Sequence, residues 1–319
     1  MYSDVDITFT LLKSALDGST PELGSMDVSR WWSLFRRMQQ NHVAALTYNA
    51  TARCEVSRDV LMPWLSEREK GIDWHRYQSG VQKDIVDTML RNGIRTLVLK
   101  GTHLAQYYPE PELREFGDLD LYFFDSHAEA DRVAQRELKV TVNTEPHHHT
   151  RYNYRGVTVE SHYDFFNSYY PGSNKPYNKM LASIAPSPTF DVLHFLRHAA
   201  IHFAAKGLNL RDLCDWAMIV ANGKDTNWDT VEREINHFGM ASFVAALDEI
   251  TRTRLGIASP LHFCAPADAA DHLIHDLFYS KPHPTAVGQY FHSRWKRRLA
   301  FGDSLPSQFL HKTLSHLSH

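Results

Sequence analysis

The stretch that decides the fold is Leu99-Lys100-Gly101-Thr102, followed by Arg114-Glu115-Phe116-Gly117-Asp118-Leu119-Asp120-Leu121. The apolar run over residues 119–124 predicts a β-strand, on which Asp118 and Asp120 leave by one face while the leucines enter the core. Two carboxylates placed so close together repel each other unless cations neutralise them. Such oxygen ligands suit Mg²⁺ or Mn²⁺, and two of these ions about 3.5–4 Å apart stabilise both the entering and the leaving oxygen of a phosphoryl or nucleotidyl transfer.

The residues before the acids predict a turn that can hold an anion. Residues 94–99 are β-branched and aliphatic, which is typical of a strand, and Gly101 and Thr102 lead from it into a short helix that ends before Pro109. The first N–H groups of a helix lack partners within the helix and carry the positive end of its dipole. We therefore expect a triphosphate to lie between this turn and the cations on the aspartates. An Asp-x-Asp pair alone is more often part of a loop or cap, so the metal interpretation depends on these surroundings.

A third carboxylate is expected on a later strand. Residues 150–154 and 157–166 are rich in β-branched and aromatic residues, and Arg155-Gly156 between them predicts a hairpin. On the second of these strands Glu160 and His162 share one face. Beside the aspartate strand, Glu160 can take a proton from an acceptor hydroxyl or hold a metal. The alternative is an edge strand whose polar face is solvated.

Two cations flank the acids in the sequence. Lys100 precedes the turn and Arg114 precedes the acid pair. Each can neutralise a phosphate, arginine as a planar fork and lysine as a point charge. The alternative for each is an ion pair with a neighbouring acid, such as Asp118, Glu112 or Glu115.

These motifs together resemble the bacterial uncharacterised nucleotidyltransferase family within the polymerase-β-like nucleotidyltransferase superfamily. The resemblance covers roughly residues 80–220. It implies that Asp118, Asp120 and Glu160 hold the metals and that Gly101 and Thr102 form the nucleotide-binding turn. Thr102 departs from the Gly or Ser that the superfamily favours, and the gap between the turn and the acid pair is longer than in the common form. The resemblance implies transfer of a nucleoside monophosphate from a nucleoside triphosphate (NTP) to an acceptor hydroxyl or phosphate, with Mg²⁺ or Mn²⁺ as cofactor and release of pyrophosphate.

Hydrophobic periodicity predicts an α+β chain with three parts. Residues 1–92 form an N-terminal helical region, residues 93–188 a core with a mixed sheet, and residues 189–319 a C-terminal helical region. The resemblance implies that residues 93–188 are the nucleotidyltransferase core. In the first part we expect one helix over residues 28–52 and a long helix that ends at Asn92-Gly93. Residues 167–188 are rich in Pro, Ser and Asn and are expected to form a polar link.

The histidines require care, because the chain has 20 of them. His194, His198 and His202 recur every four residues along a predicted helix, a stripe that is more often structural than metal-binding. In the family that the chain resembles, such a helix packs beside the catalytic sheet. We therefore expect the residues of a base or acceptor pocket to include the following: His162, His198, Arg211 and Asp215. The run His147–His149 is expected on a surface strand or loop.

Composition narrows the class of protein. The 319 residues carry a net charge of −3, and the pI is near 6.7, unlike a general nucleic-acid binder. The basic run Arg294–Arg298 is interpreted as a solvated helix face, with an RNA acceptor as the alternative. The three cysteines lack Cys-x-x-Cys spacing, and no apolar run approaches the ~20 residues that span a bilayer. We expect a cytoplasmic protein that does not associate with membranes.

Two classes of function remain open. The first is a Mg²⁺-dependent nucleotidyltransferase, whose acceptor is a small molecule, an RNA or a protein. The second is a non-catalytic nucleotide-binding or regulatory protein on the same fold, and a metal phosphohydrolase built on the helical histidines is a distant third. Three mutually repelling carboxylates have no chemical reason to persist in a decayed site, which favours the first class. The acceptor, the preferred base and the oligomeric state are not specified by the sequence.

Overall fold

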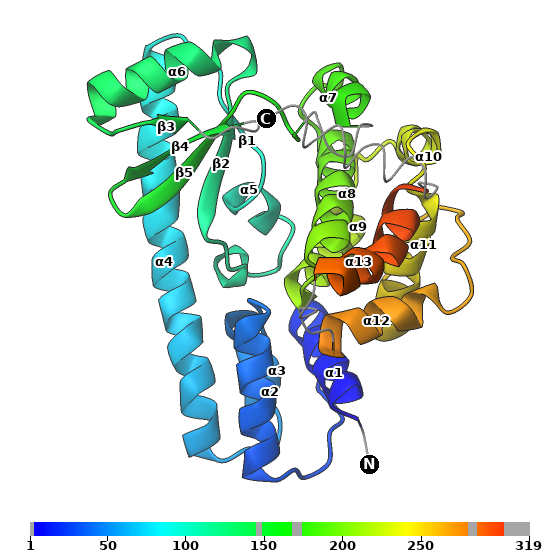
Figure 1. The fold of residues 1–319 in the computed structure, drawn as a ribbon. Helices are drawn as coiled ribbons and strands as arrows, with labels where there is room; N and C mark the ends of the chain where they lie inside the picture. The colour runs from blue at the N-terminus through cyan, green and yellow to red at the C-terminus, as the bar shows by residue number, and fades with distance from the viewer. Residues whose placement is uncertain (1–2, 145–148, 168–173, 280–285, 303–319) are drawn as a thin grey trace.

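A mixed sheet of five strands lies against long helices in this α+β protein (Figure 1). The computed structural model describes residues 3–144, 149–167, 174–279 and 286–302. The strands are β1 (Leu97–Val98), β2 (Asp118–Tyr122), β3 (Asn143–Thr144), β4 (His149–Tyr154) and β5 (Val157–His162). Their order in the sheet is β1-β2-β5-β4-β3. The predicted α+β class with a mixed sheet and helical flanks is confirmed.

The register of the central strands decides where the acids lie. β2 and β5 run parallel, with Asp118 opposite Thr158 and Asp120 opposite Glu160. The other strand pairs are antiparallel. Leu119 and Leu121 are fully buried in a hydrophobic cluster on the other face of the sheet. The alternation expected for this strand is therefore present, and the acids share one face.

The N-terminal region contains four helices, which are listed with their bounds: α1 (Asp4–Asp17), α2 (Val28–Gln40), α3 (Ala44–Ala52) and α4 (Arg58–Arg91). The prediction of a single helix over residues 28–52 is wrong. The helix is interrupted between α2 and α3, where His42 has a φ of 57°. The long helix α4 ends at Asn92 and Gly93 as predicted, with a φ of 74° at the glycine.

Short helices connect the strands. α5 (Thr102–Ala105) follows the glycine turn and is shorter than predicted. α6 (His127–Val133) continues as a π-helical turn to Leu138 and covers the sheet together with α4.

The C-terminal helices are α7 (Asn174–Ala182), α8 (Pro188–Ala205), α9 (Leu210–Asn222), α10 (Trp228–His237), α11 (Ala241–Ile250), α12 (Ala269–Tyr279) and α13 (Ala286–Phe301). α7 lies inside the segment expected to be a polar link. Tyr177 and Leu181, four residues apart, are fully buried there, and Asn178 exchanges hydrogen bonds with the backbone of Phe166. Tertiary contacts therefore stabilise a helix that its Asn and Pro content conceals. Among the described helices, none is long and apolar enough to cross a membrane.

Two hydrophobic clusters organise the packing. One joins the N-terminal helices to the C-terminal helices, with Trp31, Trp64 and Trp216 fully or almost fully buried in it. The other packs the C-terminal half of α4 and helix α6 against the sheet. Residue 92 therefore does not separate two independent cores, and the three-part division of the chain stays a prediction.

Candidate active site

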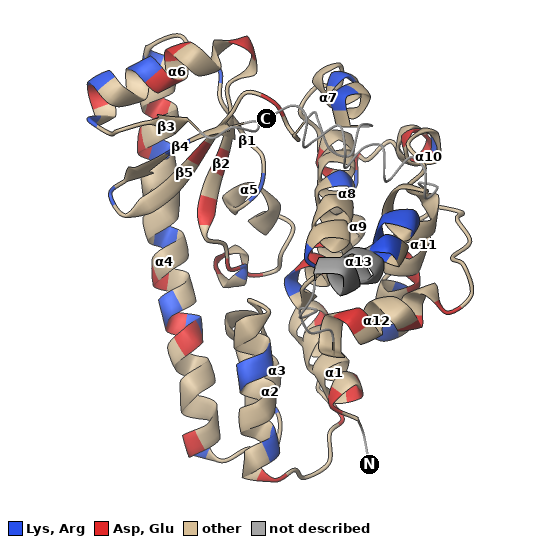
Figure 2. Ribbon diagram, viewed as in Figure 1, with Lys and Arg blue, Asp and Glu red and all other residues tan. Residues whose placement is uncertain are grey.

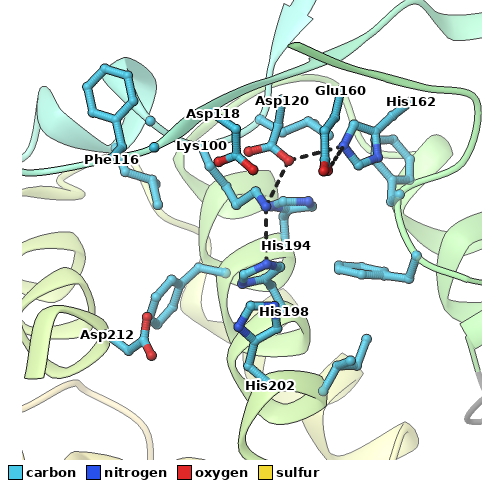
Figure 3. A pocket seen from close by; sticks show the side chains of 18 of the residues that line it. Lys100, Phe116, Asp118, Asp120, Glu160, His162, His194, His198, His202 and Asp212 are labelled. Atoms are coloured by element: carbon cyan, nitrogen blue, oxygen red, sulfur yellow. Dashed lines mark hydrogen bonds and ion pairs between the residues drawn. The ribbon is translucent and has the colours of Figure 1, made fainter. Parts of the chain in front are cut away.

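A cavity of about 430 Å³ lies between the sheet and helices α8 and α9. From the sheet it is lined by the following residues: Asp118, Asp120, His149, Arg151, Glu160 and His162. From the helices it is lined by the following residues: His194, His198, His202, Arg211, Asp212 and Asp215. Figure 3 shows the three acids pointing from the strands toward the column of histidines on α8. The structure thus brings the predicted acids and the four predicted pocket residues to the wall of one cavity.

The turn that enters α5 needs glycine. Gly101 has φ 57° and ψ −120°, a backbone conformation that side chains disfavour. A Cβ at this position would also lie 3.2 Å from the ring of Phe116. Glycine therefore lets the chain turn sharply at the cavity, and the preceding residue, Lys100, places its ammonium among the acids.

The hydroxyl of Thr102 contacts the long helix α4. The hydroxyl donates a hydrogen bond to the amide oxygen of Gln82 on α4. The side chain therefore ties the turn to the long helix.

Lys100 links the acids to the histidine column. Its Nζ lies 2.9 Å from Oδ1 of Asp120 and 3.1 Å from Nε2 of His198. An ammonium can only donate, so His198 accepts through Nε2. Burial and the nearby ammonium lower the pKa of His198 well below its ordinary value, which keeps this imidazole neutral. Burial opposes ionisation of Asp120, but Lys100 and His162 hold the pKa of this carboxyl far below its usual range.

Glu160 faces Asp120 across the two parallel strands. Its Oε1 lies 2.5 Å from Nη2 of Arg151, and its Oε2 lies 3.6 Å from Nε2 of His162. Burial alone would raise the pKa of Glu160, yet hydrogen bonds from His162 and Arg151 lower it to about 2. For Asp118, burial and repulsion by Asp120 raise the pKa. Nearby cationic side chains therefore balance the acids, and a divalent ion can take over that role.

Charge is distributed unevenly around this site. Figure 2 shows acidic residues on both β2 and β5, whereas basic and acidic residues alternate along α4.

The basic run Arg294–Arg298 is only partly a solvated face, because Lys296 is buried and its Nζ lies 2.5 Å from Oδ1 of Asp276.

Arg114 is held by hydrogen bonds to α9 and to the glycine turn, and its predicted contact with a phosphate stays a prediction. Its Nε and Nη2 each donate to a carboxylate oxygen of Asp215 over 2.7 Å, and its Nη1 donates to the carbonyl of Gly101 over 3.0 Å. The hydroxyl of Tyr108 donates to the same Asp215 over 2.7 Å. Arg114 therefore forms an ion pair, the alternative that the sequence left open. Its partner is Asp215 on α9 and not an acid nearby in the sequence. Arg114 holds the glycine turn against α9.

The other predicted pocket residues are placed as follows. Asp215 lines the cavity, but its oxygens accept from Arg114 and Tyr108. Arg211 also lines the cavity, and its Nη1 donates to the carbonyl of Glu115 over 3.0 Å. His162 contacts Asp120 directly, whereas His198 contacts Lys100, which in turn pairs with Asp120.

Sequence reasoning missed two residues of β4. His149 was expected at the surface, yet its side chain is 12% exposed and lies opposite His162, whereas His147 and His148 lie outside the described residues. Arg151 lies opposite Glu160. The two-residue turn at Arg155-Gly156 could have identified both residues. It pairs Tyr154 with Val157, and this first pair fixes the partners of all the other residues in the hairpin.

A family model described as an uncharacterised nucleotidyltransferase matches residues 27–256. The chain belongs to this family. The match begins before α2 and extends past α11, so it contains the sheet and both walls of the cavity. No curated protein and no solved structure matches the chain. The description of the family supports nucleotidyl transfer as the general activity.

Proposed function

We propose that this nucleotidyltransferase moves a nucleoside monophosphate from an NTP to an acceptor hydroxyl or phosphate and releases pyrophosphate. The observation that supports this most directly is the trio of carboxylates on one sheet face, with Asp118 and Asp120 on β2 and Glu160 opposite Asp120 on β5. Carboxylate oxygens are the donors that Mg²⁺ and Mn²⁺ prefer, so the donor set fits these cofactors. When bound, such ions neutralise the charge that develops on the transferred phosphoryl group.

The chain's own residues would position the reactants. Lys100 carries its ammonium to the edge of the acid cluster, where it can neutralise a phosphate oxygen. The positive φ of Gly101 brings the backbone of the turn to the cavity wall, where we place the phosphates of the NTP. A carboxylate with a pKa of about 2 is a weak proton acceptor, so we assign Glu160 to metal binding rather than to the role of base. Positioning and charge neutralisation would then supply most of the rate.

Transfer of label tests this proposal. The purified protein is incubated with each NTP labelled at the α-phosphate, Mg²⁺ or Mn²⁺, and a cell extract as the source of acceptor. We expect label on an acceptor with the wild type and none with Asp120→Asn, which keeps the size of the side chain but removes its charge. Asp131→Asn is the matched control, because Asp131 accepts hydrogen bonds from Thr150 and Ser161 and does not line the cavity. Equal transfer by the wild type and Asp120→Asn would refute the site.

One observation keeps a non-catalytic nucleotide-binding or regulatory role as the second candidate. Lys100, Arg151 and His162 already balance the charge of the acids without any added ion. Thermal unfolding with and without metal and NTP tests occupancy, because a ligand at about 100 times its Kd stabilises the folded state by about 2.7 kcal/mol. We expect this stabilisation for the wild type and not for Asp118→Asn. Stabilisation without transfer of label would favour the regulatory role.

A further inference from the structure

The side chains of His149, Glu160 and His162 form a second group of metal-ligand type, which shares Glu160 with the three acids. We propose that they bind a transition-metal ion of the Zn²⁺ class. One ligand atom from each of the three lies within 4.8 Å of the other two. Two imidazoles with one carboxylate are a ligand set of zinc sites, whereas Mg²⁺ prefers oxygen ligands alone. The inference shares Glu160 with the proposed function but does not require that nucleotidyl transfer takes place.

Strand register holds these ligands together. Glu160 and His162 are two residues apart on β5 and therefore share a face, and His149 on β4 lies directly opposite His162. Asp120 on β2 lies directly opposite Glu160. Four donor side chains from three neighbouring strands thus form a staggered set on one face of the sheet, with Asp120 beside Glu160 in one row and His162 beside His149 in the next. Such a set is fixed by backbone hydrogen bonds rather than by flexible loops.

The separations of the donor atoms suit one small ion. His149 Nε2 lies 3.7 Å from Oε1 of Glu160, and His162 Nε2 lies 3.6 Å from Oε2 of the same side chain. Ligands at about 2.0–2.1 Å from a tetrahedral Zn²⁺ are about 3.3 Å apart. The two contacts with Glu160 exceed this separation by a few tenths of an ångström, and one donor atom from each of the three residues lies within 4.8 Å of the others. Oδ1 of Asp120 lies 3.1 Å from His162 Nε2 and 2.9 Å from Nζ of Lys100, and it would serve as a fourth donor once the ion replaces these contacts.

The competing interpretation is a closed network of ion pairs that leaves no room for metal. Arg151 donates to Oε1 of Glu160, and His162 contacts both Glu160 and Asp120. The Arg151 side chain is 47% exposed, however, whereas those of His149 and Glu160 are 12% exposed. Arg151 can therefore withdraw into solvent when an ion takes its place, and the buried donors stay where the sheet holds them.

The test uses Co²⁺ as a spectroscopic probe of the metal-stripped wild-type protein. We expect the visible absorption bands of four-coordinate Co²⁺ with nitrogen ligands, loss of these bands on addition of Zn²⁺, and no loss in excess Mg²⁺. His149→Ala should weaken Co²⁺ binding by at least about tenfold. His202→Ala is the matched control, because His202 lines the same cavity from α8 but is not among the three ligands, and it should leave Co²⁺ affinity unchanged.

Several results would overturn the inference. These are the absence of four-coordinate bands in the wild type, displacement of Co²⁺ by Mg²⁺ as readily as by Zn²⁺, and equal Co²⁺ affinity in the wild type and His149→Ala. Should His149→Ala fail to fold, Glu160→Gln removes the anionic ligand at nearly constant volume and should also abolish the bands. Failure of the wild type to transfer label would refute the proposed function and leave the Co²⁺ result standing, so the two failures are distinguishable.

Discussion

Replacing Arg114 by lysine tests whether this side chain holds the turn or binds a phosphate. A single ammonium cannot reach both oxygens of Asp215 and the carbonyl of Gly101, so at least one bond to Asp215 and the bond to Gly101 are lost. A hydrogen bond to a charged group contributes about 1.5–3 kcal/mol, and a buried group left without a partner costs about 1–3 kcal/mol. We therefore expect Arg114→Lys to lower the free energy of unfolding by about 3–5 kcal/mol.

The assay is urea unfolding followed by circular dichroism, combined in a double-mutant cycle with Asp215→Asn. Both single changes break the same contact, so their effects should not add, and the double variant should lie within about 1 kcal/mol of the less stable single variant. Additive losses would show that the Arg114–Asp215 contact contributes little. If Arg114→Lys has normal stability but loses the NTP-dependent rise in melting temperature, Arg114 does not hold the turn. That result would favour a contact between Arg114 and a phosphate of the NTP.

Two further predictions concern the turn and the histidines. Gly101→Ala should destabilise the protein by about 1–3 kcal/mol and reduce the stabilisation by NTP and Mg²⁺, because alanine disfavours a φ of 57° and its Cβ would lie 3.2 Å from the ring of Phe116. The control for melting temperature is Gly24→Ala, because no atom lies within 4 Å of a Cβ at that position. Burial lowers the pKa of His202 to about 4 and that of His194 to about 3. In the unfolded chain these pKa values are about 6.5, so below pH 6.5 the unfolded state binds more protons than the folded state, and the free energy of unfolding falls. The melting temperature should therefore fall as the pH drops from 6.5 to 4, less steeply in His202→Gln, and a rise over that range would contradict these pKa shifts.

The parts of the site that the sequence predicts are those fixed by local geometry. A strand has a period of two, so Asp118-Leu119-Asp120-Leu121 states on its own which side chains share a face. The same reasoning applies to Glu160 and His162, and the hairpin turn at Arg155-Gly156 follows from two positive φ angles, 50° and 78°. That the two strands lie side by side required either the structure or the resemblance to a family.

The parts that escaped prediction depend on partners far away in the chain. Arg114 pairs with a carboxylate 101 residues later, and the hydroxyl of Thr102 binds an amide 20 residues earlier. No periodicity connects such positions, because both contacts arise from how helices pack around the turn. Helix α7 was missed for a related reason, since burial of Tyr177 and Leu181 outweighs the weak helix propensity of its polar residues.

The ammonium of Lys100, held between Asp120 and His198, has a practical consequence. In small zinc domains the ion is part of the folding free energy, and chelators unfold them. Here the counter-charge is tethered to the backbone, so EDTA should remove divalent ions while the far-ultraviolet circular dichroism stays native. Preparations freed of one ion can then be reloaded with another by dialysis, without a refolding step.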